Sequence, residues 1–358
     1  MGAVSRHADA VVLALNSGSS SLKYGLYAVA GSYPTLLLGD VIETTDDHGV
    51  FFDTVSIALR KANASAPTVI GHRIVHGGPH RDRHCLIDDA VLADLEAACA
   101  FAPLHGRASL ALIRMAQARY PALPQVACFD TAFHAGMPDV AKALPIPRAY
   151  RADGVRRYGF HGLSCESILR QLGDDMPARL VIAHLGNGAS VTAVLDGRSI
   201  DTSMGLTPSG GVVMATRTGD LDPGVLLFLL REKAMPAAAL ATMIDHASGM
   251  MGVSGLSSDM RRLRDAAATD ADATLAIRMF QRSVCKQVAA MAASLGGIDI
   301  LVLTGGIGEN DAATTQAIRD GLAWLPALRI TTIPSQEDEQ IALHAAWLCS
   351  GSKPDHFL

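Results

Sequence analysis

Short apolar runs alternate along the chain with longer segments of helical periodicity. The runs Val11–Leu15 and Leu22–Val29 enclose the polar segment 16–21, which predicts a strand, a tight turn and a returning strand. A second hairpin of this kind is predicted half a chain later, from Leu180–Ala183 and Val191–Leu195. The repeated pattern indicates two similar half-domains.

Helical periodicity, with apolar residues every three or four positions, marks four longer segments. They are Asp88–Ala100, Ala108–Ala118, Val225–Glu232 and Asp270–Leu295. A further apolar run, Ile300–Leu303, leads into the glycine-rich segment 304–310, which is predicted as a loop. This mixture of strands and helices favours a layered α/β fold. Pro145, Pro147 and the charged segment 148–157 mark the predicted domain boundary.

Composition narrows the class of protein. The chain has 358 residues, 49% hydrophobic and 18% charged, which is enough apolar material for two sizeable cores. The formal net charge of -5 gives no basic stripe for a nucleic acid. The apolar run Val225–Leu230 is far shorter than the ~20 residues of a membrane span, and Val11–Leu15 is too short for a secretory signal. Six dispersed cysteines without a CxxC pair predict reduced thiols, so we expect a cytoplasmic protein without membrane or nucleic-acid partners.

Three loops rich in glycine, serine or both follow apolar runs, at residues 16–21, 186–190 and 305–310. Small residues let backbone N–H groups approach phosphate oxygens closely. A single loop of this type is most often an ordinary hairpin. The sequence has neither GxxxxGK[ST] nor a GxGxxG that opens a helix. Three such loops in one chain predict instead a nucleotide held between two domains.

Two arginines and one aspartate are candidates for chemistry. Arg73 lies in a glycine-flanked turn, and Arg217 lies beside Asp220 and Asp222. A guanidinium group suits bidentate recognition of carboxylate or phosphate, although a surface ion pair is the commoner role of a lone arginine. Asp130 ends an apolar run, where an acid either caps a turn or faces a ligand cleft, and both readings stay open.

Histidines recur every four residues in one segment, at His72, His76, His80 and His84. On a helix this spacing would predict a metal-binding face and a metallohydrolase. The segment 77–79 (Gly-Gly-Pro) interrupts such a helix, so this is the weakest reading. His105, His161 and His184 lie beside glycine or proline turns, where a histidine is more often structural than catalytic.

Eight motifs stand in the order in which acetate kinases carry them, and the chain resembles that family from about residue 11 to residue 345. The motifs are NSGSSSLK (16–23), GHRIVHGG (71–78), APLH (102–105), FDTAFH (129–134), RYGFHG (157–162), HLGNG (184–188), TRTGDLDP (216–223) and GGIGEN (305–310). The resemblance implies two ribonuclease-H-like domains of the actin, hexokinase and heat-shock-chaperone superfold, with ATP in the cleft between them.

The resemblance also implies a domain division and a homodimer. Residues 1–146 plus 335–358 would form the N-terminal domain. Residues 147–334 would form the C-terminal domain, with most nucleotide contacts and the dimer interface. The implied activity is reversible phosphoryl transfer from ATP to acetate, giving ADP and acetyl phosphate. Propionate or butyrate kinase is the alternative within the class, and a non-catalytic ATP-dependent module is the alternative outside it.

The family pattern implies roles for four polar residues. Arg73 would bind the substrate carboxylate, and Arg217 and His161 would stabilise the transferring phosphoryl group. Asp130 matches the catalytic carboxylate. Because the nucleophile is itself a carboxylate and is ionised at neutral pH, we expect Asp130 to position groups rather than to act as a general base.

Further residues are implied to line the substrate and metal sites. The methyl group of acetate would lie in a pocket of Val75, Leu104 and Pro208, with His105 nearby. The β-branched Val75 favours acetate over propionate, since relatives that prefer propionate carry a smaller residue there. Mg²⁺, or Mn²⁺ in its place, would be held by Asn16 and by an acid among residues 337–339, with Glu337 the best match and Asp338 and Glu339 left open.

The nucleotide site implied by the family draws on four segments. Its residues are Lys23, His184, Leu185, Gly186, Asn187, Gly188, Asp259, Met260, Arg261, Gly306, Ile307, Gly308, Glu309 and Asn310. The chain departs from the family in two places. The stretch between Asn16 and Arg73 is shorter by about two dozen residues, and the stretch between His161 and His184 is slightly compressed. Neither departure removes a motif residue.

Overall fold

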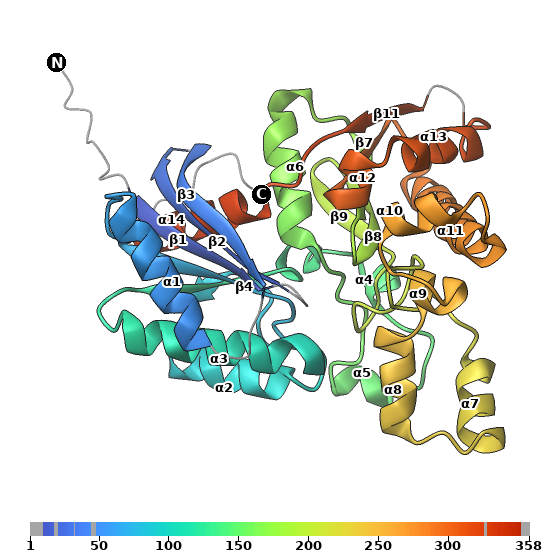
Figure 1. Ribbon diagram of the computed structural model, residues 1–358, viewed down its shortest axis with the longest axis horizontal. Helices are drawn as coiled ribbons and strands as arrows, with labels where there is room; N and C mark the ends of the chain where they lie inside the picture. The colour runs from blue at the N-terminus through green and yellow to red at the C-terminus, as the bar shows by residue number, and fades with distance from the viewer. Residues whose placement is uncertain (1–9, 18–20, 32, 44–47, 326–327, 352–358) are drawn as a thin grey trace. The chain divides into compact units, whose positions relative to one another are not determined.

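The computed structural model describes residues 10–17, 21–31, 33–43, 48–325 and 328–351 (Figure 1). Within these ranges the side chains of residues 21, 43, 48–49 and 103–105 are not described. The chain forms two compact units: unit 1 comprises Met1–Ala135, His161–Ser167 and Gln336–Leu358, and unit 2 comprises Gly136–Phe160 and Ile168–Ser335. The expected division is residues 1–146 plus 335–358 against 147–334. In the structure the first boundary falls after Ala135, and residues 161–167 return to unit 1.

Unit 1 is built on a six-stranded sheet. Its strands are β1 (Ala10–Ser17), β2 (Ser21–Ala30), β3 (Tyr33–Glu43), β4 (Val69–Ile74), β5 (Cys85–Leu86) and β6 (Gln125–Phe129), in the order β3-β2-β1-β4-β6-β5. Strands β1, β2 and β3 form an antiparallel meander, whereas β4 pairs parallel to β1 and β6 pairs parallel to β4. The two strands of the first predicted hairpin are confirmed, whereas residues 18–20 of its turn, which belong to the first predicted phosphate loop, lie outside the described residues.

Helices cover both faces of this sheet (Figure 1). They are α1 (His48–Lys61), α2 (Asp89–Ala98), α3 (Pro103–Arg119) and α14 (Glu337–Ser350), and α6 (Gly162–Leu172) begins in this unit. Side chains alternate along β1, so Val12 and Ala14 pack with α14 while Leu13 and Leu15 pack with α1 and α3. The sheet therefore lies between two apolar layers, and its strand ends are left to carry polar groups.

Unit 2 repeats the strand order of unit 1. Its strands are β7 (Arg179–Leu185), β8 (Ala189–Leu195), β9 (Arg198–Thr202), β10 (Ile300–Thr304) and β11 (Arg329–Thr332), in the order β11-β10-β7-β8-β9. Again three strands form an antiparallel meander, while β10 pairs parallel to its first strand, β7, and β11 pairs parallel to β10. This shared topology confirms the second predicted hairpin and the predicted pair of ribonuclease-H-like folds.

The helices of unit 2 are α4 (Asp139–Lys142), α5 (Ala149–Ala152), α7 (Pro223–Glu232), α8 (Ala237–His246), α9 (Gly249–Ser254), α10 (Met260–Ala266), α11 (Ala271–Leu295), α12 (Gly305–Asn310) and α13 (Ala312–Gly321). The four predicted helices appear as α2, α3, α7 and α11, with ends moved by a few residues. Helix α11 begins at its cap Asp270, which accepts from two backbone N–H groups, and ends at Gly296 with φ 66°. Among the described residues, none of the helices is both long and apolar enough to cross a membrane.

The predicted loop at 304–310 is wrong, because residues 305–310 form the short helix α12. Glycines disfavour a helix, but tertiary contacts hold this one in place. Oε1 of Glu309 accepts from the backbone N–H groups of Gly305 and Ser335, each at 2.9 Å. Gly305 has φ 77°, which suits the turn from β10 into the helix.

Candidate active site

Three predicted site residues meet at one edge of the unit 1 sheet. Asn16 and Arg73 lie near the ends of β1 and β4, and Asp130 directly follows β6. Because these strands are parallel, their carboxyl ends share one edge of the sheet. Nη2 of Arg73 donates to Asp130 at 2.7 Å, and Nε lies 3.1 Å from each oxygen of that carboxylate. Nη1 of Arg73 donates to Oδ1 of Asn16 at 3.0 Å.

The first turn of α14 brings two acids to the same place. Nδ2 of Asn16 donates to Glu337 at 3.2 Å and to Asp338 at 2.7 Å. Glu337 also lies 3.6 Å from Nη1 of Arg73. Lys23 stands opposite Asn16 in the ladder between β1 and β2. Two of the three candidate acids, Glu337 and Asp338, are thus in contact with Asn16.

The charges of this cluster are unbalanced. One guanidinium group faces the carboxylates of Asp130, Glu337 and Asp338, of which Asp130 is only 1% exposed. Burial raises the pKa of Asp130, and the hydrogen-bonded Arg73 acts in the opposite direction. Burial also raises the pKa of Asp338, against the hydrogen bond from Asn16. Burial disfavours the charge on Arg73, but the three acids more than compensate and raise its pKa. The excess of carboxylate oxygens fits a hard divalent cation such as Mg²⁺.

His161 is held against Asp130 through the backbone. The N–H group of Gly162 donates to the carbonyl oxygen of Asp130 at 2.8 Å. A Cβ atom on Gly162 would lie 2.3 Å from that oxygen, so only glycine fits there. His161 itself is buried and has φ 59°, a left-handed conformation that costs a non-glycine residue about 1–3 kcal/mol and that is common at functional sites.

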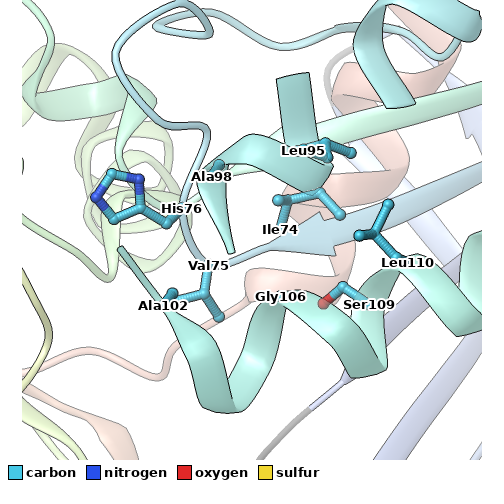
Figure 2. Close-up of a pocket in the computed structure, with 9 residues that line it drawn as sticks. All are labelled: Ile74, Val75, His76, Leu95, Ala98, Ala102, Gly106, Ser109 and Leu110. Carbon is cyan, nitrogen blue, oxygen red and sulfur yellow. The ribbon is translucent and has the colours of Figure 1, made fainter. Parts of the chain in front are cut away.

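Val75 lines an apolar pocket in unit 1. Figure 2 shows its side chain among residues from α2, α3 and the segment between them, and the pocket has an empty volume of about 270 Å³, open mouth included. Its lining is Ile74, Val75, His76, Leu95, Ala98, Ala102, Gly106, Ser109 and Leu110. Leu104 and His105, which were predicted to lie near Val75, fall on α3, but their side chains lie outside the description.

In unit 2 the two predicted phosphate segments converge. His184 lies near the end of β7, and Gly186 opens the turn into β8. A Cβ atom on Gly186 would lie 3.7 Å from Nε2 of His184 and 3.9 Å from the backbone N of Gly306. Gly305 packs so closely on Leu185 that a Cβ atom there would lie 2.9 Å from its carbonyl oxygen. The segments 184–188 and 305–310 therefore meet at the carboxyl ends of the parallel strands β7 and β10.

Several side chains predicted to bind nucleotide also make contacts that hold the local structure. Glu309 accepts from two backbone N–H groups, as described above, and Asn310 donates to the carbonyl oxygen of Gly306 at 2.9 Å. Asp259 caps α10 by accepting from the N–H group of Arg261 at 2.9 Å, and Met260 is buried. The side chains of Glu309, Asn310 and Asp259 thus each have a structural contact, and Met260 is buried.

Arg217 and Pro208 are brought together in unit 2, where Nη1 of Arg217 donates to the carbonyl oxygen of Pro208 at 3.3 Å. The carbonyl oxygen of Arg217 accepts from the N–H group of Met214 at 3.2 Å. Gly249 has φ 61°, and a Cβ atom there would lie 2.7 Å from the same carbonyl oxygen. The loop that carries Arg217 is thus fixed by close backbone packing.

The histidine repeat does not run along one helix face. His72 is on β4 and pairs with Gln125 at 2.8 Å, whereas His76 stacks on the ring of Phe101 with 5.3 Å between centroids. His84 accepts from the backbone N–H group of Phe129. The structure thus sends these side chains to separate partners. The structure also places Glu166 beside His84. The sequence analysis did not predict this acid, because it lies in none of the motifs.

Comparison with known proteins places the chain in a family. Residues 50–330 match the family model described as the acetokinase family. Acetate kinase of Nitrobacter hamburgensis is 40% identical over 363 aligned positions, which cover 93% of this chain and 89% of that protein. Acetate kinase of Rhodopseudomonas palustris is 37% identical over 398 positions, covering 96% and 99% of the two chains. Since 398 positions exceed the 358 residues of this chain, that relative carries insertions.

Solved structures agree with the sequence relatives. The crystal structure of Porphyromonas gingivalis acetate kinase matches with a TM-score of 0.83 and 32% identity, covering 95% of this chain and 100% of the other. A propionate kinase from Francisella tularensis matches with a TM-score of 0.86 and 34% identity, at the same coverage. The similarity thus extends over nearly the whole of both chains.

Proposed function

Because this chain belongs to the acetokinase family, we propose that it is an acetate kinase, which transfers the γ-phosphoryl group of ATP to acetate and gives ADP and acetyl phosphate in a reversible reaction. The observation that carries this proposal beyond the family is the arrangement of Arg73 against Asp130 and Asn16 at the strand ends. A module that only switches with ATP has no need of such a carboxylate clamp.

Arg73 has donors to offer a substrate. Its guanidinium group has five N–H bonds, and in the described structure the hydrogen bonds to Asp130 and Asn16 engage one on each of its three nitrogens. One N–H on each terminal nitrogen makes no hydrogen bond to a described residue, although Glu337 lies 3.6 Å from Nη1, and together these two N–H groups can bind both oxygens of a substrate carboxylate. Asp130 thus fixes the direction in which Arg73 presents this pair. This supports a positioning role for Asp130.

Phosphoryl transfer requires charge stabilisation more than covalent chemistry. We assign Arg217 and His161 as donors to the equatorial oxygens of the transferring group, in agreement with their family positions. The strained backbone of His161 and the tight loop around Arg217 hold these donors in place before the reaction begins. Acetate needs no general base, because its carboxylate is already ionised at neutral pH.

A magnesium ion fits the acids at the start of α14. Glu337 and Asp338 offer carboxylate oxygens, and Asn16 orients both through its amide N–H bonds. When bound, Mg²⁺ (or Mn²⁺) would neutralise phosphate charge on ATP, and it would keep several of its own waters. The side-chain oxygen of Asn16 already faces Arg73, so Glu337 and Asp338 are the better direct ligands.

The nucleotide would be held mainly by backbone groups of unit 2. The segments 184–188 and 306–310 converge and present small residues, which allow close approach of phosphate oxygens. Asp259 and Arg261 would serve the adenosine side, and Lys23 in unit 1 would add a further contact to ATP. Met260 and Glu309 would contribute through their backbone positions.

A hydroxamate-trapping assay tests the function directly. The purified protein would be incubated with ATP, Mg²⁺ and, in separate reactions, formate, acetate, propionate and butyrate. We expect acyl phosphate to form most efficiently from acetate. Absence of hydroxamate with every acid, in a folded protein that still binds ATP, would reject the kinase assignment and favour the non-catalytic module.

Propionate kinase is the second candidate, and the likeness to the Francisella tularensis propionate kinase favours it. The two functions differ in the ratio of kcat/KM for acetate and propionate in the same assay. Val75, two residues after Arg73, is buried and lines an apolar pocket, and its branched side chain supports acetate as the preferred acid. A higher kcat/KM for propionate would reverse the assignment.

An exposed apolar helix supports a homodimer formed through unit 2. None of the ten residues of α7 is buried, and Val225, Leu227, Phe228 and Leu230 are all exposed. A contiguous apolar surface of this kind marks an interface. We expect Leu227→Glu with Phe228→Glu to give a monomer by analytical ultracentrifugation. Val140→Glu, at an isolated and exposed apolar side chain, is the matched control and should remain dimeric.

The protein is proposed to act in the cytoplasm, without membrane or nucleic-acid partners. All six cysteines are free thiols in the structure, and this supports a reducing compartment. Fractionation of cells that produce the untagged protein tests the assignment.

A further inference from the structure

A histidine–glutamate–histidine cluster lies within unit 1, apart from the contacts of Arg73. Oε2 of Glu166 is 2.7 Å from Nε2 of His344, and Oε1 is 3.4 Å from Nε2 of His84. The two imidazole rings are 3.9 Å apart between centroids. All three side chains are largely buried, with at most 16% of each exposed. Neither the proposed reaction nor any predicted motif uses this cluster.

The spacing of these three groups suits a metal ion, but the hydrogen bonds do not. The backbone N–H group of Phe129 donates to Nδ1 of His84 at 2.9 Å, so Nδ1 carries a lone pair. In a neutral imidazole the other nitrogen, Nε2, then carries the proton and donates to Glu166. A metal on Nε2 would move that proton to Nδ1, where it would point at the N–H group of Phe129. Nε2 of His344 lies 2.7 Å from the other carboxylate oxygen and 3.1 Å from Nε2 of Gln340. The cluster is therefore a hydrogen-bond network centred on Glu166.

Each member of the network is tied to an element that carries a catalytic group. Phe129, which donates to His84, is the residue before Asp130. Glu166 lies five residues after His161, in the second turn of α6. His344 lies seven residues after Glu337 on α14, which is two helical turns or about 10 Å along the same face.

We propose that Glu166 is a positioning residue for the phosphoryl-transfer reaction: through His84 and His344 it fixes β6, α6 and α14 relative to one another, and so it sets the places of Asp130, His161 and Glu337. The proposal rests on the proposed kinase function. The charge of Glu166 is secured by its partners. Burial raises the pKa of this carboxyl, but His344 and His84 outweigh burial and hold the pKa below its ordinary value.

Two substitutions separate charge from shape. Glu166→Gln keeps the size but replaces one acceptor oxygen with an amide N–H that opposes a histidine donor. Glu166→Asp keeps both acceptor oxygens and the charge but is one methylene shorter. We expect Glu166→Gln to lower kcat at least tenfold, with KM for ATP and for acetate within about twofold of wild type. Glu166→Asp should retain more of kcat than Glu166→Gln, whereas a residue that only fills space would give the reverse order.

Asp299→Asn is the matched control. Asp299 forms a two-bond ion pair with Arg179 at the amino ends of β7 and β10, whereas the segments 184–188 and 305–310 lie at the carboxyl ends of these strands. It should lower the melting temperature without changing kcat. Unchanged kcat in Glu166→Gln, or an equal loss of kcat in Asp299→Asn, would overturn the proposal.

Hydrogen exchange gives a readout that needs no enzyme activity. In Glu166→Gln we expect faster amide exchange in residues 337–344 and 161–167, and no such change in Asp299→Asn. Unaltered exchange there would sink the positioning role, even if the wild-type protein is a kinase. If exchange changes in Glu166→Gln but the wild-type protein phosphorylates no carboxylate, the proposed function is rejected while the structural network stands. Calorimetry with Zn²⁺ completes the test, because tight binding that is lost in Glu166→Gln would make the cluster a metal site.

Discussion

Arg73→Ala is the sharpest test of how this chain holds its acid substrate. The two remaining N–H donors of Arg73 would each make a charge-assisted hydrogen bond to acetate. Hydrogen bonds to charged groups contribute about 1.5–3 kcal/mol, and each 1.4 kcal/mol changes affinity tenfold. Loss of both bonds would cost about 3–6 kcal/mol, so KM for acetate should rise by about 100-fold or more. KM for ATP should rise much less than KM for acetate, because most of the nucleotide segments belong to unit 2.

The same substitution should also weaken the fold. Asp130 is 1% exposed, and Arg73 is its partner at 2.7 Å. Removing one member of a buried ion pair leaves the other charge uncompensated and costs about 3–5 kcal/mol. The double variant Arg73→Ala with Asp130→Asn should recover part of that free energy of unfolding, since a neutral amide is cheaper to bury. It should not recover KM for acetate.

Initial rates in the hydroxamate assay, with acetate and ATP varied separately, give the two KM values, and urea unfolding gives the stability. Arg179→Ala is the control, because it breaks an Arg–Asp ion pair of similar length in unit 2, where the side chains are more exposed. It should leave KM for acetate unchanged. Equal increases in both KM values for Arg73→Ala, or recovery of acetate binding in the double variant, would show that Arg73 holds only the structure around it.

Three further outcomes are expected. Arg217→Ala should lower kcat by about 10²-fold or more, because a lost transition-state donor is worth about 3 kcal/mol, and KM for acetate should change less. Arg217→Lys should restore little of kcat, and steady-state kinetics measure both variants. Val75→Ala should widen the apolar pocket and lower or invert the acetate-to-propionate ratio of kcat/KM; the change in relative activation free energy should be about 1–3 kcal/mol at most. An unchanged ratio would show that Val75 does not line the substrate pocket. Burial lowers the pKa of His72 to about 4 in the folded protein. As the pH falls from about 6.5 to 4, His72 is therefore protonated in the unfolded chain before it is protonated in the folded protein. Urea unfolding should therefore show about 3 kcal/mol of stability lost over this window through His72, and a flatter pH dependence in His72→Gln.

Local patterns predicted the strands well because each sheet buries one or both faces. The alternation along β1 sends neighbouring residues to different helix layers, and the resulting apolar run is visible in the sequence. Once β1, β4 and β6 are parallel, the polar residues at their ends must meet. The meeting of Asn16, Arg73 and Asp130 thus follows from strand placement, although their hydrogen bonds do not.

The glycine-rich segment after β10 shows where local reasoning fails. Three glycines in four residues predict a loop, because glycine has a low helix propensity. The helix α12 forms all the same, since Glu309 binds the N–H groups of Gly305 and of the distant Ser335. A contact that spans 26 residues leaves no trace in the periodicity of the segment itself.

The network around Glu166 is even harder to predict from the sequence. Its members are 82 and 178 residues apart along the chain, and they become neighbours only when α6 and α14 pack in unit 1. The histidine repeat even pointed to another grouping, in which His84 would share a helix face with His72 and His76. The strand β4 and the turn after it separate these residues instead.

Charge balance explains why such remote groups matter to this chemistry. Acetate, the γ-phosphate and the acids Asp130, Glu337 and Asp338 are all negative, so they would repel one another if each were free to move. Arg73 neutralises only part of this charge, and its effect depends on the direction of its two remaining donors. Asp130 sets that direction. The backbone around Asp130 is itself held by two hydrogen bonds: the N–H group of Gly162 donates to the carbonyl oxygen of Asp130, and the N–H group of Phe129 donates to His84. Asp130 matches the family's catalytic carboxylate, but its position is better explained by a role in orienting the guanidinium group of Arg73.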